Sequence, residues 1–324
     1  MIRKVKVENG WVRGIPAADP RITSYKGIPF AAKPIGENRW RAPQPCPDWE
    51  GELFAAEFGP IAMQANCAGD PAKDIYAREW AVDAELPMSE DCLYLNVWAP
   101  ADGRKNMPVY VWYFGGGLQV GNTTEMEFDG ERLARRGIVV VTVGYRLNVF
   151  GFMCHPEITA QQPEAPANFG FLDQQCATRW VKRNIAAFGG DPDRITVLGF
   201  EAGAVSILLL AASERAKGLF QRAFVFSGNL EEAYDTPERS RALAAELLKE
   251  TRTSTMQELQ LLSTATLKDA AQKLWRKLSA PSCDGNLIPL DVLRAYREGK
   301  ASGIDFIIGF PGNETQIWRS VIGN

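Results

Sequence analysis

The stretch RITVLGFEAGAVSILLLAA, residues 194–212, contains the strand, turn and helix on which the fold assignment rests. Arg194 to Leu198 is a short apolar run typical of a buried strand, and Ala202 to Ala212 is apolar enough for a buried helix. Between them lies GFEAG, which has the form G-x-nucleophile-x-G, because glycines permit a tight turn with a strained residue at its tip. Glu201 occupies that tip, where such turns usually carry a serine.

Composition and charge exclude several classes of protein. The 324 residues are 46% hydrophobic, which suits one large α/β domain or two smaller ones. The net charge is -3 without a long run of either sign, so we expect no nucleic-acid partner. No apolar leader follows the basic N-terminus and no stretch has the length of a membrane span, so we expect a cytoplasmic protein. We expect no metal and no cofactor, because no His/Cys cluster has ligand spacing.

Apolar runs typical of buried parallel strands recur along the chain, with helical patterns between several of them. The runs are Tyr94–Trp98, Val109–Tyr113, Val139–Val143, Ile195–Leu198, Ala223–Phe226 and Asp305–Ile308. The clearest helical pattern is Gln174–Phe188, which starts beside Asp173 and ends before two glycines. This alternation predicts an α/β fold with a mainly parallel sheet and helices on both faces.

The segments outside these runs have simpler patterns. The opening VKVENGWVRG alternates apolar and polar residues around Asn-Gly and predicts a β-hairpin. From Pro29 to about Pro87 the many prolines and glycines predict irregular structure with short elements. Residues 237–277 have the pattern of consecutive charged helices. We expect a single domain over residues 1–324, with residues 237–300 as a helical insertion or cap within it.

Together, these motifs resemble the type-B carboxylesterase family of the α/β-hydrolase fold, the group that includes cholinesterases and bacterial esterases. The resemblance covers nearly the whole chain, in the family's order. The segments that carry it are SYKGIPFAAKPIGENRWRAPQP from Ser24, SEDCLYLNVWAP from Ser89, VYVWYFGGGLQVGN from Val109, VTVGYRLNVFGF from Val141, NFGFLDQQCATRWVKRNIAAFGGDPDRITVLGFEAG from Asn168, AKGLFQRAFVFSG from Ala216 and IIGFPGNET from Ile307. The resemblance implies an α/β-hydrolase fold whose C-terminal part is absent, because the family's catalytic histidine comes well after the acid and the chain stops at Asn324.

The resemblance also implies roles for single residues. Gly116, Gly117 and Ala202 match the backbone N–H donors of the family's oxyanion hole. Glu314 matches the acid of the family's Ser-His-Glu triad. Phe114 stands where the family usually has a histidine before the glycines, which removes a polar support but leaves the backbone donors.

Two cysteines also match family positions. Cys67 and Cys92 correspond to a loop disulfide of secreted relatives. A cytoplasmic protein would keep such a pair reduced, so both states of the pair remain open at this point.

Glu201 and the absence of the family's histidine decide the functional expectation. Serine hydrolysis needs a hydroxyl nucleophile, a base and an orienting acid, and this chain lacks the first two. His155, the only histidine, follows GFMC in another loop, and we expect a structural role for it. Aspartate nucleophiles exist at such turns, but glutamate is longer and a histidine-activated water is missing. We therefore expect the Glu201 carboxylate to fold into the oxyanion hole of an inactive site.

The sequence leaves three functions open. The first is a carboxylesterase-family protein whose inherited activity, hydrolysis of small hydrophobic esters, is impaired. The second is a non-catalytic binding or scaffold protein. The third is a fragment or split half that needs a C-terminal complementing chain. In that case an uncovered sheet edge would favour either this complement or a homo-oligomer as the partner.

Overall fold

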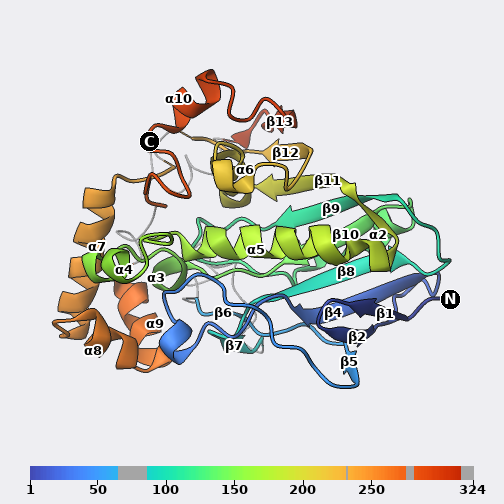
Figure 1. Ribbon diagram of the computed structural model, residues 1–324, viewed down its shortest axis with the longest axis horizontal. Helices are drawn as coiled ribbons and strands as arrows, with labels where there is room; N and C mark the ends of the chain where they lie inside the picture. Colours follow the sequence, from blue (N-terminus) through green and yellow to red (C-terminus); the bar gives the residue numbers. More distant parts are fainter. Residues whose placement is uncertain (65–85, 231–232, 275–280, 315–324) are drawn as a thin grey trace.

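The computed structural model describes residues 1–64, 86–230, 233–274 and 281–314, and within them eight strands form one central sheet (Figure 1). These strands are β3 (Ile15–Pro16), β4 (Ile22–Pro29), β8 (Tyr94–Pro100), β9 (Met107–Tyr113), β10 (Val139–Val143), β11 (Gly190–Phe200), β12 (Arg222–Phe226) and β13 (Asp305–Gly309). Their order is β13-β12-β11-β9-β10-β8-β4-β3. Neighbours from β13 to β10 are parallel, whereas β8, β4 and β3 are antiparallel to their neighbours. The predicted α/β class with a mainly parallel sheet is confirmed.

All six predicted strands are present, but one prediction about their direction is wrong. The run Tyr94–Trp98 lies in β8, which pairs antiparallel with β10. A parallel neighbour needs a crossover of a dozen or more residues. Only residues 101–106 join β8 to β9, so the chain turns back directly and β8 runs opposite to β9 and to its own neighbour β10.

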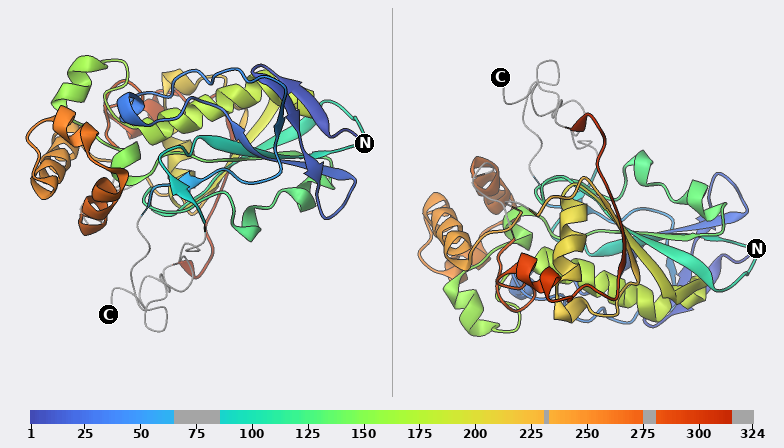
Figure 2. Two further views of the ribbon diagram at one scale, coloured as in Figure 1. Left: turned by 90° about the horizontal axis from the view of Figure 1, so that it is seen from below. Right: turned by 90° about the horizontal axis from the view of Figure 1, so that it is seen from above.

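Helices cover both faces of the sheet (Figure 2). On one face lie α5 (Phe169–Asn184) and α6 (Ala202–Ala211), which pack against β11. On the other face α2 (Glu131–Ala134) packs against β8 and β10.

The predicted start of α5 beside Asp173 is wrong, because α5 begins at Phe169. Asp173 is fully buried inside this helix, where its oxygens accept hydrogen bonds from Nε and Nη2 of Arg146 at 2.8 and 2.7 Å. Arg146 therefore neutralises the Asp173 carboxylate within the helix, although the sequence pattern placed Asp173 at the helix start.

The core lies mainly between the sheet and the α5/α6 layer. Val109 and Val111 of β9 and Ile195 and Val197 of β11 point to this face and are fully buried. Their neighbours in the strands point to the opposite face, because successive side chains alternate across a sheet.

The remaining elements lie around this framework. The predicted N-terminal hairpin is confirmed as β1 (Lys4–Val7) paired with β2 (Gly10–Arg13). The other short elements are β5 (Glu52–Phe54), β6 (Ile61–Ala62), β7 (Met88–Ser89), α3 (Asn148–Gly151), α4 (Pro156–Gln161) and α10 (Val292–Arg297), with the 3-10 turns η1 (Gly36–Asn38), η2 (Met126–Phe128), η3 (Ile185–Phe188) and η4 (Glu214–Ala216).

The helices predicted over residues 237–277 are present as α7 (Pro237–Thr251), α8 (Met256–Leu261) and α9 (Thr264–Lys273). The predicted end at residue 277 lies outside the described residues. In Figure 1 these helices stand at the end of the molecule toward which the arrowheads of β9 and β11 point. They therefore lie beyond the carboxyl ends of the parallel strands, and their role as a cap within a single domain stays a prediction.

Candidate functional site

Glu201 lies at the tip of the turn between β11 and α6. Its backbone has φ 52° and ψ −115°, a conformation that costs a non-glycine residue of order 1–3 kcal/mol. Gly199 and Gly203, on either side of this tip, have no room for a side chain, because neighbouring backbone atoms approach them closely. A Cβ on Gly203 would lie 2.2 Å from the carbonyl oxygen of Tyr113, and one on Gly199 would lie 2.4 Å from the carbonyl carbon of Gly203. The strand, tight turn and helix predicted from GFEAG are all present.

The Glu201 carboxylate lies against the three glycines at residues 115–117, which follow β9 and are called the glycine run; the loop that they begin, residues 115–121, is the glycine-run loop. Its Oε2 accepts hydrogen bonds from the N–H groups of Gly116 at 2.7 Å and Gly117 at 3.0 Å. Both glycines have left-handed φ values, 104° and 62°, which let the two N–H groups converge on one oxygen. Charge-assisted bonds of this kind contribute about 1.5–3 kcal/mol each where they are well shielded from water, and less here, because the Gly117 bond is exposed and the Gly116 bond is only partly buried. The protein's own side chain thus occupies the point where the two donors meet.

Ala202, the third donor implied by the family resemblance, is the first residue of α6. Its side chain is buried directly after Glu201. The position agrees with the N–H following the residue at the tip, and its role as an oxyanion donor stays a prediction.

Gln64 holds the end of the glycine-run loop through two backbone contacts. Its Oε1 accepts from the N–H of Gly121 at 2.9 Å, and its Nε2 donates to the carbonyl of Gly121 at 3.0 Å. The side chain is fully buried. Sequence reasoning missed Gln64, because it lies in a segment without periodicity and no local pattern marks it.

Phe114 and Tyr145 support the start of the glycine run. The two rings stack with centroids 4.2 Å apart, and the Tyr145 hydroxyl donates to the carbonyl of Phe114 at 2.6 Å. Burial raises the pKa of Tyr145 well above its usual value, and the negative charge of Glu201 raises it further. Tyr145 therefore stays a neutral donor at ordinary pH. It lies in the segment VTVGYRLNVFGF, which the sequence analysis used for the family resemblance without assigning the tyrosine a role.

Glu314 follows β13 beyond the carboxyl ends of the parallel strands, which is also the end of the sheet at which Glu201 lies. Phe200, Phe226 and Gly309 lie side by side in register at the ends of β11, β12 and β13. The Oε2 atom of Glu314 is buried and has no hydrogen-bond partner within the described residues. An acid that orients a base needs such a partner, so the triad role of Glu314 stays a prediction.

The two cysteines of the predicted pair differ in what the structure describes. Cys67 lies outside the described residues. Cys92 is buried, and burial is the chief cause that raises the pKa of its thiol. A bond between Cys67 and Cys92 stays a prediction.

His155 has a structural use in the described part of the chain. It is the N-cap of α4, and its Nδ1 accepts a hydrogen bond from the N–H of Glu157 at 3.2 Å. Burial lowers the pKa of His155, and the charge of Glu157 opposes this effect. These contacts agree with the expected structural role.

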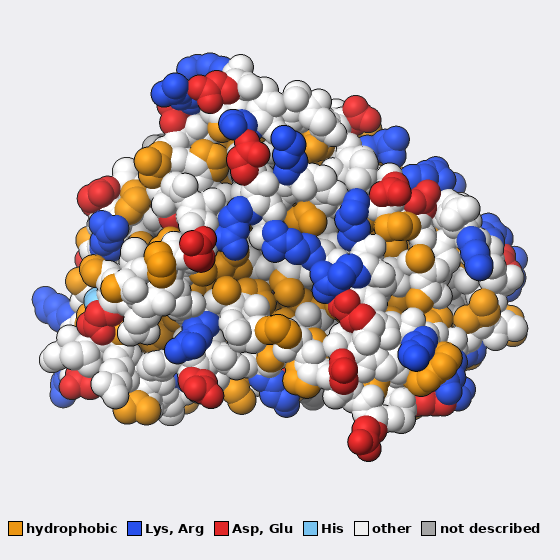
Figure 3. Space-filling model, in the orientation of Figure 1, with side chains coloured by type: hydrophobic (Ala, Val, Ile, Leu, Met, Phe, Trp, Pro, Cys, Tyr) orange, Lys and Arg blue, Asp and Glu red, His pale blue; other side chains and the backbone are white. Residues whose placement is uncertain are grey.

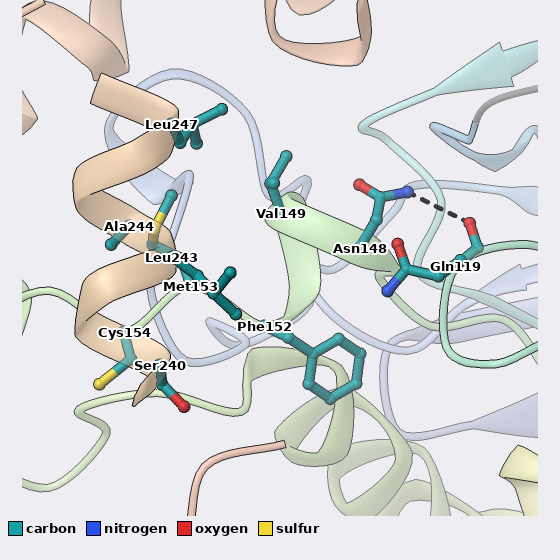
Figure 4. Close-up of a pocket in the computed structure, with 10 residues that line it drawn as sticks. All are labelled: Gln119, Asn148, Val149, Phe152, Met153, Cys154, Ser240, Leu243, Ala244 and Leu247. Carbon is teal, nitrogen blue, oxygen red and sulfur yellow. Dashed lines mark hydrogen bonds between the residues drawn. The ribbon is translucent and has the colours of Figure 1, made fainter. Parts of the chain in front are cut away.

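A cavity lies beside the glycine-run loop, between that loop, α3 and α7 (Figure 4). Most of its lining is apolar. In one wall, Asn148 Nδ2 donates a hydrogen bond to the backbone carbonyl of Gln119 at 3.3 Å. Gln119 also connects the cavity to the glycine run, because its N–H donates to the carbonyl of Gly116 at 3.0 Å. The lining residues are Gln119, Asn148, Val149, Phe152, Met153, Cys154, Ser240, Leu243, Ala244 and Leu247.

We next consider the distribution of surface charge, groups of side chains that could bind a metal, and helices that could span a membrane. Acidic and basic side chains are interspersed over the face drawn in Figure 3. Across the described ranges, no group of three or more His, Cys, Asp or Glu side chains is arranged to hold a metal ion. No helix within those same ranges is both long and apolar enough to span a membrane.

Comparisons with known proteins agree on one family. The model of the carboxylesterase family matches residues 2–324. The para-nitrobenzyl esterase of Bacillus subtilis is 37% identical over 322 residues, which cover 96% of this chain and 62% of that protein. The cholinesterase of Mus musculus is 35% identical, over 97% of this chain and 51% of that protein.

Solved structures give the same answer. A carboxylesterase of Geobacillus stearothermophilus superimposes with a TM-score of 0.86 at 35% identity, covering 99% of this chain and 64% of that one. The α/β-hydrolase fold expected from the resemblance is thereby confirmed. The chain spans between half and two thirds of the length of these relatives.

Proposed function

This chain belongs to the carboxylesterase family, and we propose that it is a member whose ester-hydrolysis site is filled by its own Glu201 carboxylate and has lost turnover. One observation carries the proposal. The N–H groups of Gly116 and Gly117 both donate to Glu201 Oε2 instead of facing an open site.

The chemistry of the site supports this proposal. Ester hydrolysis develops negative charge on the former carbonyl oxygen, and converging N–H donors stabilise that charge. A carboxylate bound to the same donors excludes the substrate oxygen both by its volume and by its charge. Glu201 also replaces the hydroxyl that would attack the ester, so one substitution removes the nucleophile and blocks its electrophilic support.

The substrate class follows from the family and from the cavity. We propose that the inherited substrates are small hydrophobic esters. The apolar side chains of Val149, Phe152, Met153 and Leu247 line the cavity that Gln119 connects to the glycine-run loop, and they support this class because alkyl groups gain free energy on leaving water for such a lining.

Location in the cytoplasm remains part of the proposal. Four cysteines in the described ranges outside the predicted Cys67–Cys92 pair, Cys46, Cys154, Cys176 and Cys283, are free thiols, and thiols persist best in a reducing compartment. Cell fractionation with thiol labelling of the native protein tests this point.

The central experiment compares p-nitrophenyl butyrate hydrolysis by the native protein and by Glu201→Ala, each purified and shown to melt cooperatively. We expect no turnover above background from either protein. Turnover that is present in the native protein and lost in Glu201→Ala would show that Glu201 performs ester chemistry, and the proposal would then be wrong.

A binding measurement tests the blocked donors directly. We expect butyrate to bind Glu201→Gly, which removes the carboxylate and tolerates the positive φ, and not to bind the native protein. Glu258→Gly, which changes an exposed glutamate of α8, is the matched control and is expected to behave like the native protein. Equal butyrate binding by the native protein and Glu201→Gly, measured by calorimetry, would contradict a self-occupied site.

A further inference from the structure

We propose that Gln64 and Asn148 are positioning residues, which hold the glycine-run loop in the shape that makes the N–H groups of Gly116 and Gly117 converge. The inference rests on the proposed function, because it concerns the donors that Glu201 fills. It adds that these donors keep their geometry through two buried amide side chains and not through Glu201 alone.

The glycine-run loop needs support because its backbone conformation is unfavourable. Gly116, Gly117, Leu118 and Gly121 all have left-handed φ values, of 104°, 62°, 58° and 110°. Leu118 carries a Cβ, which makes this conformation costly at its position. Such a backbone persists only where the surrounding contacts fix it.

Gln64 fixes the last residue of this loop. Besides its two bonds to Gly121, its Nε2 donates to the carbonyl of Ala62 at 3.0 Å, so the amide is anchored at the end of β6. Gly121 in turn lies against the start of the loop, since a Cβ on it would lie 2.6 Å from the carbonyl oxygen of Gly115. Holding Gly121 therefore helps to hold both ends of the loop.

Asn148 supports the middle of the loop. Its Nδ2 donates to the carbonyls of Met63 at 2.8 Å and Gln119 at 3.3 Å. Its backbone N–H donates to the carbonyl of Leu118 at 2.8 Å. These bonds tie the residues directly after the glycine run to the segment that also carries Gln64.

This support reaches the donors through the backbone. The N–H groups of Gln119 and Val120 both donate to the carbonyl of Gly116, at 3.0 and 3.1 Å. That carbonyl and the N–H of Gly117 belong to one planar peptide unit, so orienting the carbonyl also orients the donor. A shift of residues 118–120 would therefore turn the Gly117 N–H away from its acceptor.

Asn148 is the residue at which this role can be tested most cleanly. Its side chain is 6% exposed, and its φ is 45°, which asparagine tolerates better than most residues do. Asn148→Gly removes the amide bonds to Met63 and Gln119 and accepts the left-handed backbone freely.

The first test measures butyrate binding by calorimetry in the Glu201→Gly background. Adding Asn148→Gly is expected to weaken this binding by about tenfold or more, because a converging donor is turned away. Asn168→Gly is the matched control, since Asn168 is also buried, has φ 60° and donates from Nδ2 to a backbone carbonyl, that of Ser282. It should lower the melting temperature but change the affinity by less than about twofold.

The second test needs no ligand and uses amide hydrogen exchange in the otherwise native protein. Asn148→Gly is expected to speed exchange at Gly116 and Gly117 by about tenfold or more, while the amides of β9 and β11 keep their native rates. Asn168→Gly should leave exchange at both glycines unchanged. Gln64→Met keeps the side-chain length, removes the bonds to Gly121 and should act as Asn148→Gly does in both measurements.

The outcomes separate this inference from the proposed function. Equal butyrate affinity with and without Asn148→Gly would overturn the positioning role, and so would faster exchange that is uniform across the sheet. If Glu201→Gly itself binds no butyrate, the self-occupied site is wrong, and the exchange rates at Gly116 and Gly117 then decide the positioning role by themselves.

Discussion

Glu201 combines an unfavourable backbone conformation with two favourable hydrogen bonds. The turn imposes φ 52°, and packing around Gly199 and Gly203 leaves little freedom to relax it. The carboxylate then offsets part of this cost by accepting from Gly116 and Gly117. Glu201 is therefore both a functional substitution and a structural tie between the turn after β11 and the loop after β9.

This balance predicts the order of stability of two variants. Glu201→Ala keeps the positive φ and loses both hydrogen bonds, so we expect it to be destabilised by about 1–3 kcal/mol. Glu201→Gly loses the same bonds but accepts the backbone conformation freely, so we expect it to be more stable than Glu201→Ala by about 1 kcal/mol. Urea denaturation of the three proteins measures the difference. If Glu201→Gly is the less stable of the two variants, the turn does not hold this residue under strain.

At the scale of single residues, the sequence predicted the place of Glu201 in the site but not the roles of Gln64 and Tyr145. The position of Glu201 and its approach to the glycine run followed from GFEAG and the family pattern, because turn geometry is local. Gln64 and Tyr145 could not be assigned in the same way, since their partners Gly121 and Phe114 are distant in sequence and become neighbours only in the folded sheet.

Among the elements, α4 depends on a titratable group at its first turn. His155 Nδ1 accepts from Glu157 N–H, which requires the unprotonated ring nitrogen. Burial lowers the folded-state pKa of His155 below its ordinary value of 6.5, and the charge of Glu157 only partly offsets this effect. The unfolded chain therefore binds the proton more readily than the folded chain.

The pH dependence follows from this difference. The stabilisation from neutral His155 is fully present above pH 6.5 and is lost as the pH falls through the lower folded-state pKa. We expect the native protein to lose free energy of unfolding relative to His155→Asn as the pH falls from about 7.5 to about 5.5, because asparagine caps without titrating. Urea titrations at several pH values measure this.

A suitable control is Thr236→Asn, which changes the N-cap of α7 without adding or removing a titratable group. Its stability relative to the native protein should not change over the same range. A pH-independent difference between the native protein and His155→Asn would contradict the role assigned to the ring nitrogen.

The elements also show why strand positions were easier to predict than strand direction or helix starts. Apolar runs identified β9, β10 and β11 because each buries its side chains whatever its neighbours are. The direction of β8 depended on the short link that follows it. The start of α5 depended on Arg146, which neutralises Asp173 inside the helix and lies outside the periodic pattern.

In the whole molecule, a buried ion pair joins the irregular N-terminal segment to the helices beyond the sheet. Arg39 Nε donates to Glu90 Oε2 at 2.7 Å, and both side chains are more than nine-tenths buried. Arg39 Nη1 also donates to the carbonyls of Gln260 and Leu262 at 2.7 and 2.9 Å, and Thr264 donates to Glu90. These bonds connect the sheet framework to α8 and α9, which supports the prediction that residues 237–300 belong to a single domain.

Arg39→Met tests this connection. The variant leaves the Glu90 carboxylate buried without its charged partner, which typically costs about 3–5 kcal/mol. We expect one cooperative melting transition in the native protein, a lower melting temperature in Arg39→Met, and faster hydrogen exchange in residues 256–273 than in β9 to β11. Arg104→Met, which breaks the exposed pair with Asp102, should cost about 1 kcal/mol or less. Unchanged exchange in α8 and α9, or two separate transitions in the native protein, would show that these helices fold independently of the sheet.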